Sequence, residues 1–417
     1  MARFQWFNGN QGIYGFDQFN QYVELSRSTT GLVLGFDATR GPFDPQVQAA
    51  QIEMTYAGYK TAVIGAGPQA GGFQVIGGVL TGLRYLAADG SLLVEITGLA
   101  VSLPVALATL HRGDGAGLWQ MICNTGGTFL GSGSAVGPGH PQSGDVIDTG
   151  ARADSVSGFG GDDFMQDRGG ADHYNGGTGF DTVSYSSWFY RPSGVTGGIT
   201  ADLVLGTVSG PDGTADQIQS IEAVYGTFLA DNIKGNASAN SFIGFAGYDR
   251  FDGRGGFDMV SYDQDITQGG LDGIKVNLFK AQIRDGFGYL DKVISVEGVE
   301  GTSAADIFLD NALDNYFQGN GGDDLFSFGA GNDTGRGGAG ADVFAFRGLA
   351  FGDDTVQDFD AAAGDSVQIV SVTSFAQLII STVTVNGGVA AFVECAAGSV
   401  TLMGVTAGQL TATDFGF

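Results

Sequence analysis

A nine-residue spacing of aspartates is the feature of this sequence that most limits how the chain can fold. From Asp145 onward, aspartates recur at every ninth residue as far as Asp181. This spacing fits neither the 3.6-residue period of an α-helix nor the two-residue alternation of a strand. It is typical of a chain that winds in regular turns, so that each aspartate returns to an equivalent place.

The same spacing returns in two further tracts, and apolar residues keep step with it. The second tract begins at Asp231 and the third at Asp306, with asparagine replacing aspartate at Asn240 and Asn315. An apolar residue lies two positions after nearly every member, but glycine stands there at Gly335. The phased aspartates are Asp145, Asp154, Asp163, Asp172, Asp181, Asp231, Asp249, Asp258, Asp306, Asp324, Asp333 and Asp342.

Glycines occupy fixed positions of the same repeat and predict its local shape. The complete unit reads G-G-x-G-x-D-x-apolar-x, as in residues 176–184. Its first six residues are expected to form a tight turn, because glycine adopts conformations that a Cβ hinders. The last three residues predict a short strand whose middle side chain points inward. Stacked turns of this kind predict a parallel β-roll with an apolar interior.

Two similar insertions interrupt the predicted roll. Residues 186–230 align with residues 263–305, and Asp216 and Asp291 take equivalent places in them. Each insertion is predicted to leave the roll as a β-hairpin unit and to rejoin it in phase. We therefore expect an interrupted β-roll over residues 141–346.

The flanking regions lack the ninefold spacing but also predict β structure. Residues 1–140 contain alternating apolar and polar segments between glycines, which favours a β-sandwich-like domain. Residues 347–417 contain alternating apolar strands and are predicted to form a C-terminal β cap. The expected fold class of the whole chain is all-β.

The acidic composition favours cation binding and argues against nucleic acid as a partner. Asp and Glu number 45 and Lys and Arg number 18, which gives a net charge of −27. Binding of nucleic acid needs a basic face, whereas many carboxylates on a glycine-rich chain suit calcium. We expect no membrane span, because no apolar run is long enough. The first residues also lack the apolar core of a signal peptide.

The repeat resembles the calcium-binding nonapeptide of the RTX (repeats-in-toxin) family. The segments GGTGFDTVS and GGAGADVFA match that motif at every position, and the resemblance covers roughly residues 140–346. It implies several calcium ions, bound between turns two nonapeptides apart. The C-terminal region resembles the uncleaved signal of RTX proteins exported by type I secretion. The resemblance therefore implies an extracellular protein that engages the type I secretion machinery.

The resemblance also implies which residues bind calcium, namely the phased aspartates and carbonyl groups of the glycine turns. The pairs expected to form the best sites are Asp163–Asp181 and Asp324–Asp342. Asp154–Asp172 is expected to follow them, and Asp231–Asp249 to be weaker. The pairs with Asn240 and Asn315 depart from the pattern, because asparagine keeps an oxygen ligand but loses a charge. The turn glycines implied as ligands are Gly158, Gly161, Gly176, Gly179, Gly319 and Gly322.

No catalytic motif is visible, and three classes of function stay open. The absence of H-E-x-x-H and G-x-S-x-G argues against the usual zinc-protease and lipase sites. The leading prediction is a non-enzymatic cell-surface or matrix protein that self-assembles as a surface-layer or filament subunit. Its expected partners are copies of itself and cell-surface polysaccharide. The aromatic segment 4–22 is either an arm that pairs with a neighbouring copy or a first strand packed on its own domain. The alternatives are an adhesin or polysaccharide-binding protein, with specificity in residues 1–140, and a polysaccharide-modifying enzyme.

Overall fold

The structure, a computed structural model, contains β-strands and short 3-10 turns but no α-helix among the residues it describes. The described residues are 22–27, 31–36, 51–63, 73–86, 92–102, 128–130, 146–149, 151–186 and 197–416. They confirm the all-β fold class. None of the helical turns in these residues is long and apolar enough to cross a membrane. Asp145 and nearly all of segment 4–22 lie outside the described residues.

The chain divides into two compact units. One contains residues 1–195 and 205–223, and the other contains residues 196–204 and 224–417. The division falls within the first insertion. It does not test the domain boundaries expected near residues 140 and 346, which stay predictions.

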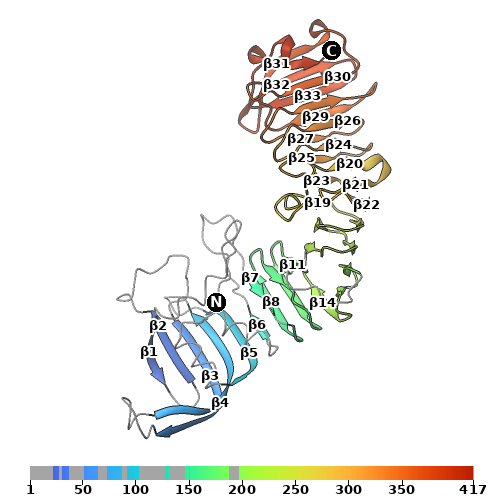
Figure 1. The fold of residues 1–417 in the computed structure, drawn as a ribbon. Coiled ribbons are helices and arrows are strands. Elements are labelled where there is room, and N and C mark those ends of the chain that lie inside the picture. Colours follow the sequence, from blue (N-terminus) through green and yellow to red (C-terminus); the bar gives the residue numbers. More distant parts are fainter. Residues whose placement is uncertain are drawn as a thin grey trace. The chain divides into compact units, whose positions relative to one another are not determined.

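The N-terminal strands form an antiparallel meander in which each strand pairs with the next along the chain. Figure 1 shows the first five as neighbouring blue arrows. A second layer, as expected of a sandwich, is not among the strands described for this region and stays a prediction. The strands are β1 (Tyr22–Arg27), β2 (Gly31–Phe36), β3 (Gln51–Val63), β4 (Phe73–Leu86), β5 (Leu92–Ser102) and β6 (Thr128–Leu130).

The first tract of repeats folds into short parallel strands that alternate between two sheets. β7 (Val146–Asp148), β9 (Phe164–Gln166) and β11 (Thr182–Ser184) pair in one sheet. β8 (Ser155–Gly160) and β10 (His173–Thr178) pair in the other, where β8 also joins β6. Each strand therefore pairs with the next but one along the chain, and one turn of the roll takes two nonapeptides.

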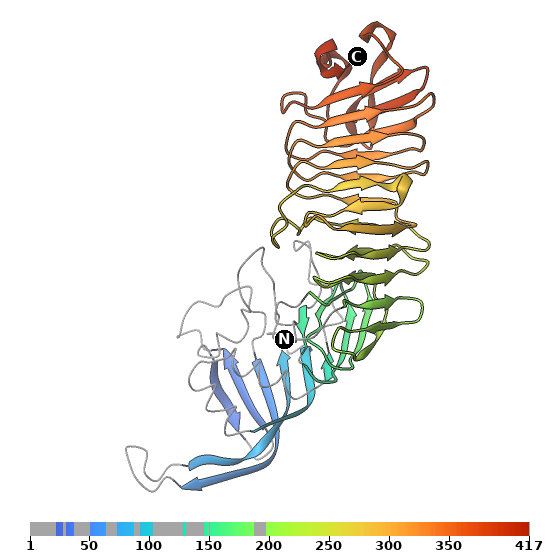
Figure 2. The ribbon, with the colours of Figure 1, turned by 45° about the vertical axis from the view of Figure 1, so that its right-hand side comes forward.

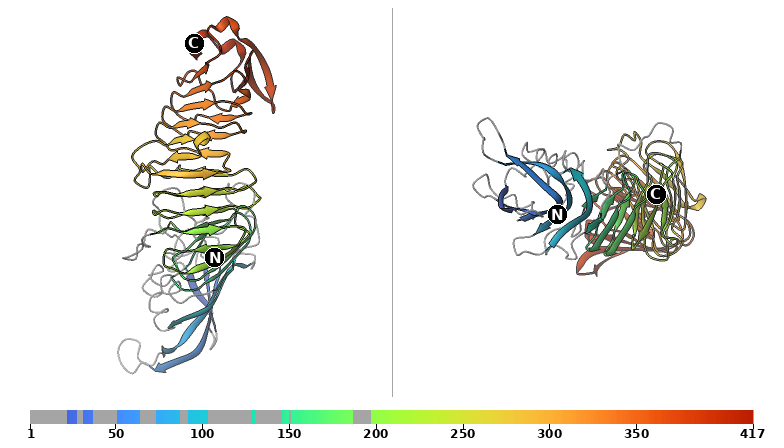
Figure 3. Two further views of the ribbon diagram at one scale, coloured as in Figure 1. Left: turned by 90° about the vertical axis from the view of Figure 1, so that its right-hand side faces the viewer. Right: turned by 90° about the horizontal axis from the view of Figure 1, so that it is seen from below.

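The second unit has the same arrangement of stacked rungs, drawn from yellow-green to red in Figures 2 and 3. One sheet contains β12 (Thr200–Asp202), β16 (Asn232–Lys234), β18 (Arg250–Asp252), β24 (Ile307–Leu309), β26 (Leu325–Phe328), β28 (Val343–Phe346), β30 (Ser366–Ile369) and β34 (Phe415–Gly416). The other contains β15 (Ala223–Tyr225), β17 (Ser241–Ile243), β19 (Met259–Ser261), β23 (Gly298–Glu300), β25 (Tyr316–Gln318), β27 (Thr334–Arg336), β29 (Gly352–Val356) and β33 (Gly398–Met403). It ends in the antiparallel strands β31 (Ile379–Val385) and β32 (Gly388–Cys395). The 3-10 turns are η3 (Leu278–Lys280), η4 (Phe375–Gln377), η5 (Ala407–Gln409) and η6 (Ala412–Asp414).

Each insertion contains an antiparallel hairpin that is anchored to parallel strands of the roll. In the first, β13 (Thr207–Ser209) pairs with β14 (Ala215–Gln219), and β14 runs parallel to β10. In the second, β21 (Gln282–Arg284) lies between β20 (Lys275–Asn277) and β22 (Leu290–Ile294) and is antiparallel to both. β22 runs parallel to β18, and β20 runs parallel to β24. The strands of the second insertion therefore belong to the same sheet as the roll strands β18 and β24.

The apolar residue of each nonapeptide fills the interior of the roll, as its spacing predicts. In the third tract the phenylalanine rings stack from turn to turn, with centroids 4.8 Å apart for Phe308 and Phe326 and 4.9 Å apart for Phe326 and Phe344. Stacked aromatic pairs stabilise a core beyond the area that they bury. The buried members of the series are Ile147, Val156, Met165, Tyr174, Val183, Ile233, Phe242, Phe251, Val260, Phe308, Phe317, Phe326 and Phe344.

Gly335, which breaks the apolar pattern, makes room for a phenylalanine at the first position of its own nonapeptide, residues 328–336. A Cβ at Gly335 would lie 2.9 Å from the ring of Phe328 and 3.2 Å from the ring of Phe344. Phe328 itself occupies a first position, where the motif has glycine, and it is buried. These two departures from the motif therefore compensate each other in the core.

Candidate metal centre

A series of hydrogen bonds joins the phased residues from one turn of the roll to the next. We call it the carboxylate ladder: the backbone N–H of a phased residue donates to a carboxylate of the next turn, which lies two nonapeptides further on where the spacing is unbroken. Asp324 N–H, for example, donates to Asp342 Oδ1 at 2.9 Å, across 18 residues. The parallel register of β26 and β28 sets this geometry, because it places equivalent residues side by side. The other pairs, donor first, are Asp154–Asp172, Asp163–Asp181, Asp231–Asp249, Asn240–Asp258, Asp306–Asp324 and Asn315–Asp333.

Asparagine changes the charge of the ladder but preserves its hydrogen bonds. The N–H groups of Asn240 and Asn315 donate to Asp258 and Asp333, both at 2.8 Å, as an aspartate N–H does elsewhere. Asn240 and Asn315 therefore occupy the same positions in the ladder as the aspartates, but each of these two positions has one negative charge fewer.

The ladder extends to six carboxylates that the ninefold spacing does not reveal. Asp172 N–H donates to Asp216 Oδ1 at 2.8 Å across 44 residues, and Asp249 N–H donates to Asp291 Oδ1 at 2.9 Å across 42 residues. The insertions lengthen the chain between these partners, so a fixed period cannot find them. Asp216 and Asp291 take equivalent places in the two insertions, and this equivalence is the sequence signal that could have identified them. The other four are Glu222, Glu297, Asp354 and Asp365.

The second oxygen of many ladder carboxylates is buried and has no hydrogen-bond partner. Backbone N–H groups hold Oδ1, whereas Oδ2 is left over. Burying a charged oxygen without a partner is unfavourable by several kcal/mol in general, so a native structure is expected to supply one. The residues with such an Oδ2 are Asp181, Asp249, Asp258, Asp324, Asp333, Asp342 and Asp354.

The glycine at the first position of the motif leaves space for this carboxylate. A Cβ at Gly176 would lie 2.3 Å from Asp181 Oδ2 and 2.2 Å from the carbonyl oxygen of Ser220. A Cβ at Gly319 would lie 1.9 Å from Asp324 Oδ2, and Gly158 faces Asp163 at the same distance. The predicted first-position glycines therefore line a space where carboxylate and main-chain oxygens come together.

The glycine at the fourth position allows successive turns to stack closely. Gly161, Gly179 and Gly322 have φ angles of 101°, 139° and 98°, a region that favours glycine. A Cβ at Gly179 would lie only 2.1 Å from the carbonyl oxygen of Gly161, one turn away. These glycines are therefore needed both for the backbone conformation and for the distance between turns.

Burial, in several cases together with repulsion from neighbouring carboxylates, raises the pKa values of many ladder aspartates. Desolvation is the largest cause at Asp324, where the charges of Asp306 and Asp342 also help to raise the pKa to about 8. Desolvation, followed by the charges of Asp231 and Asp291, raises the pKa of Asp249 to about 10. Without a cation, the ladder thus concentrates carboxylates that resist ionisation at neutral pH.

The residues present fit a calcium ion. Calcium takes six to eight oxygen ligands in flexible geometry, and the turns offer carboxylate and main-chain carbonyl oxygens. The ladder positions hold Asp, Asn or Glu, with none of the nitrogen or sulfur ligands that zinc prefers. A divalent cation there would pair the leftover oxygens and reduce the repulsion between neighbouring carboxylates.

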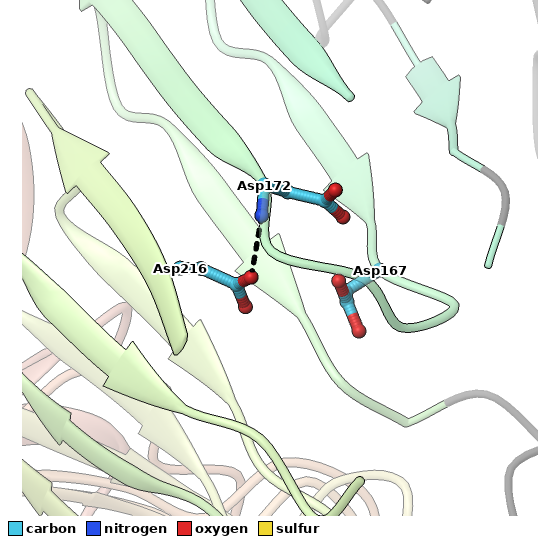
Figure 4. Close-up of side chains that lie close together, drawn as sticks. All are labelled: Asp167, Asp172 and Asp216. Atoms are coloured by element: carbon cyan, nitrogen blue, oxygen red, sulfur yellow. Dashed lines mark hydrogen bonds between the residues drawn. The ribbon is translucent and has the colours of Figure 1, made fainter. Parts of the chain in front are cut away.

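A group of three buried aspartates lies inside the first unit, in the turn before β10 and on β14 (Figure 4). It consists of the ladder residues Asp172 and Asp216 and of Asp167, which is not part of the ladder. Asp167 stands at a first position in place of glycine, a departure that could have pointed to it from the sequence. The hydroxyl of Tyr174 donates to Asp167 at 3.0 Å and to Asp172 at 2.9 Å. The hydroxyl of Tyr185 donates to Asp216 at 2.9 Å. Burial, together with the charges of Asp216 and Asp172, raises the pKa of Asp167 well above its usual range.

Parallel turns, buried carboxylate oxygens and closely stacked glycines define a calcium-binding β-roll. Comparison with protein families agrees: the model described as the RTX calcium-binding nonapeptide repeat matches residues 142–166, 148–183, 225–260 and 300–335. The chain carries RTX calcium-binding repeats, and the resemblance inferred from the sequence is confirmed. Sequence analysis alone did not identify the six further ladder carboxylates or Asp167.

Solved structures and curated proteins add little beyond this. Among 31 matching chains of solved structures is the extracellular lipase LipA from Serratia marcescens, with 18% sequence identity and a TM-score of 0.21. The match covers 47% of this chain and 40% of the lipase chain, so this chain spans well under half the length of that protein. No curated protein matches the chain.

Proposed function

We propose that the chain is a secreted, non-enzymatic protein whose β-roll orders around calcium and which then assembles with copies of itself. The observation that carries the first part is the set of buried Oδ2 atoms without partners in the ladder. Calcium would supply those partners, and a site made by the folded turns does not exist in the unfolded chain. Binding and folding are therefore coupled.

The proposed calcium sites lie between neighbouring turns of the ladder. Each combines an Oδ2 atom with carbonyl groups of the glycine turn beside it, as at Asp324 and Gly319. The proposed ligands include the twelve phased aspartates, of which Asp145 lies outside the described residues. The sites at Asn240 and Asn315 are proposed to be the weakest, because they carry less charge.

Calcium-coupled folding is consistent with export of an unfolded chain. Extracellular modules commonly bind calcium with Kd values of about 10⁻⁴–10⁻³ M. The calcium concentration of the cytosol is far below such values and would leave the sites empty. The roll would then order only outside the cell. We propose that residues 347–417 carry the signal for the type I secretion machinery.

The two insertions offer a repeated contact surface for assembly. Val204 and Phe279 occupy equivalent turns and are 63% and 83% exposed. A single exposed apolar side chain is ordinary on a protein surface. Here an exposed apolar side chain occurs at the same place in both insertions, which favours a shared role. A net charge of −27 would keep calcium-free chains apart, so bound calcium would favour contact between copies.

Calcium titration of the full chain tests both parts of the proposal. Circular dichroism should report ordering of the roll, and light scattering or electron microscopy should report assembly. Magnesium at equal concentration is the matched control, because it demands a tighter octahedral geometry. Equal order in excess chelator would contradict coupled folding. A chain that stays monomeric in millimolar calcium would contradict assembly and favour binding of polysaccharide by residues 1–140.

A further inference from the structure

The second insertion contains two buried aspartates that do not belong to the carboxylate ladder. Asp265 lies in the turn after β19, and Asp285 directly follows β21. Their side chains are 0% and 1% exposed, respectively. Asp265 lies off the ninefold spacing. Asp285 is 27 residues after Asp258, but the intervening positions hold Thr267 and Val276, and neither aspartate lies in a nonapeptide turn.

Direct contacts bring these two aspartates to the same place. Asp265 Oδ2 accepts a hydrogen bond of 2.8 Å from the N–H of Gly286, the residue after Asp285. A Cβ at Gly286 would lie 2.9 Å from the Cβ of Asp265, so glycine is needed for this approach. The N–H of Leu271 donates to the carbonyl oxygen of Gly286 at 2.9 Å and holds the two turns together.

Each aspartate has one oxygen held by the backbone and one left over. Asp285 Oδ1 accepts from the N–H groups of Phe287 at 3.1 Å and Tyr289 at 2.6 Å. Asp285 Oδ2 and Asp265 Oδ1 are buried without a hydrogen-bond partner, and so is the side-chain oxygen of Gln268 in the same turn as Asp265. This is the same division of oxygens that the ladder carboxylates show.

The surroundings of the two aspartates are strongly negative. Burial raises the pKa of Asp265 to about 8, and the charge of Asp285 contributes. The charge of Asp285 also acts on Asp249 and Asp291 of the ladder. Arg284 lowers the pKa of Asp285, but by less than burial raises it, and Arg284 is itself exposed.

The first insertion shows that the turn does not need the carboxylate for its backbone shape. Gly210 stands at the place of Asp285 and makes the same two bonds, from its N–H to Thr214 at 2.9 Å and from Gly213 N–H to its carbonyl at 3.1 Å. The corresponding bonds of Asp285, to Tyr289 and from Gly288, measure 3.0 Å and 3.1 Å. The buried acid has therefore been added to a turn that forms without it.

We propose that Asp265 and Asp285 bind a calcium ion within the second insertion, at a site separate from the nonapeptide turns. The ion would take the two leftover carboxylate oxygens, and hard oxygen ligands of this kind suit calcium. It would fasten the turn after β19 to the β21–β22 turn, and so fix the insertion on the roll. The competing account is a pair of carboxyl groups that share a proton and bind no metal.

The test compares the full chain with an Asp265→Asn, Asp285→Asn double variant and with Asp272→Asn, an exposed aspartate of the same insertion. Equilibrium dialysis with calcium counts bound ions, and thermal melts are recorded at limiting and at saturating calcium. The double variant should bind one ion fewer, while Asp272→Asn should bind as many as the parent chain. The rise in melting midpoint between limiting and saturating calcium should be smaller for the double variant than for the parent chain.

An unchanged ion count in a folded double variant would overturn the proposal and favour the shared proton. A midpoint that falls equally at limiting and at saturating calcium would overturn the proposal and assign the pair a purely structural role. If the double variant does not fold in calcium, Asp285→Asn alone gives the same readouts, since asparagine keeps the acceptor for Phe287 and Tyr289. The nonapeptide sites are tested separately by changes in the ladder, so the two proposals can fail independently.

Discussion

Each ladder aspartate uses its two carboxylate oxygens for different purposes. In Asp324 one oxygen accepts the N–H of Asp306 at 2.8 Å, which fixes the spacing of the turns. The other is buried without a partner and faces the position of Gly319. Glycine and aspartate of one motif are therefore linked physically: the glycine has no side chain because the carboxylate occupies that space.

Asp324→Asn should weaken calcium binding without disturbing the turn. Asparagine keeps an oxygen for the N–H of Asp306 but loses the charge, so we expect affinity at that site to fall on the order of tenfold. Asp323→Asn is the matched control, because Asp323 is the exposed neighbour and accepts an N–H bond from Ala341 at 2.9 Å. Isothermal titration with calcium measures both. Equal losses in the two variants would show that the ladder phase has been assigned wrongly.

Gly319→Ala should destabilise the calcium-bound roll. Its Cβ would lie 1.9 Å from Asp324 Oδ2, so the carboxylate must move, and we expect a loss of about 1–3 kcal/mol. Gly255→Ala is the control, since a Cβ there meets nothing within 4 Å. Denaturant unfolding in saturating calcium gives the comparison. A Gly319 variant as stable as the Gly255 variant would contradict the proposed packing.

At the scale of the element, the sequence predicts the strands and core residues of a roll turn wherever the ninefold spacing is unbroken. Tyr174 and Phe326 were placed in the core by spacing alone, because the register of the strands equals two repeats. Spacing failed at Asp216 and Asp354, whose partners lie 44 and 21 residues away, since the intervening chain is not a whole number of turns. It also could not show that Phe328 fills the space left by Gly335, because that compensation depends on a contact between β26 and β27, which belong to different sheets.

The metal-free roll should become less stable as pH rises from about 5 to 9. The folded-state pKa values of Asp342, Asp258 and Asp324 are about 6, 7 and 8, mainly because of desolvation, whereas an unfolded aspartate titrates near 3.9. The folded state therefore holds more protons, and stability that is fully present below the unfolded pKa is lost as pH rises through the folded pKa.

Circular dichroism in excess chelator across this pH range measures the effect as the fraction of ordered roll, with thermal melts at the acidic pH values where protonated carboxyl groups leave the roll folded. Melts in saturating calcium are the control, where the trend should flatten or reverse, because protons compete with calcium for the same oxygens. A melting midpoint in chelator that rises with pH would contradict the raised pKa values.

At the scale of the whole molecule, the chain repeats one long unit and varies its buried acids. The pairs Asp172–Asp216 and Asp249–Asp291 are equivalent, and in each a tyrosine hydroxyl donates at 2.9 Å to the second aspartate. The first long repeat adds one more buried acid, Asp167, which lies in a nonapeptide. The second long repeat adds two, Asp265 and Asp285, which lie in its insertion. The residues that the two long repeats share build the carboxylate ladder. The residues in which the repeats differ place different buried acids beside the ladder.

Assembly should depend on the exposed apolar turns of both insertions. Replacing Val204 and Phe279 together by serine removes apolar surface that is 63% and 83% exposed in the single chain, so folding and calcium affinity should be unchanged. If these side chains are buried between copies, their loss should raise the protein concentration needed for assembly by roughly tenfold or more. Light scattering across a calcium titration measures that concentration. Leu349→Ser is the control, because Leu349 is 93% exposed but lies outside the insertions. Assembly of the double variant at the parent concentration would exclude the insertions as the contact, and a chain lacking residues 1–22 would then test the N-terminal segment.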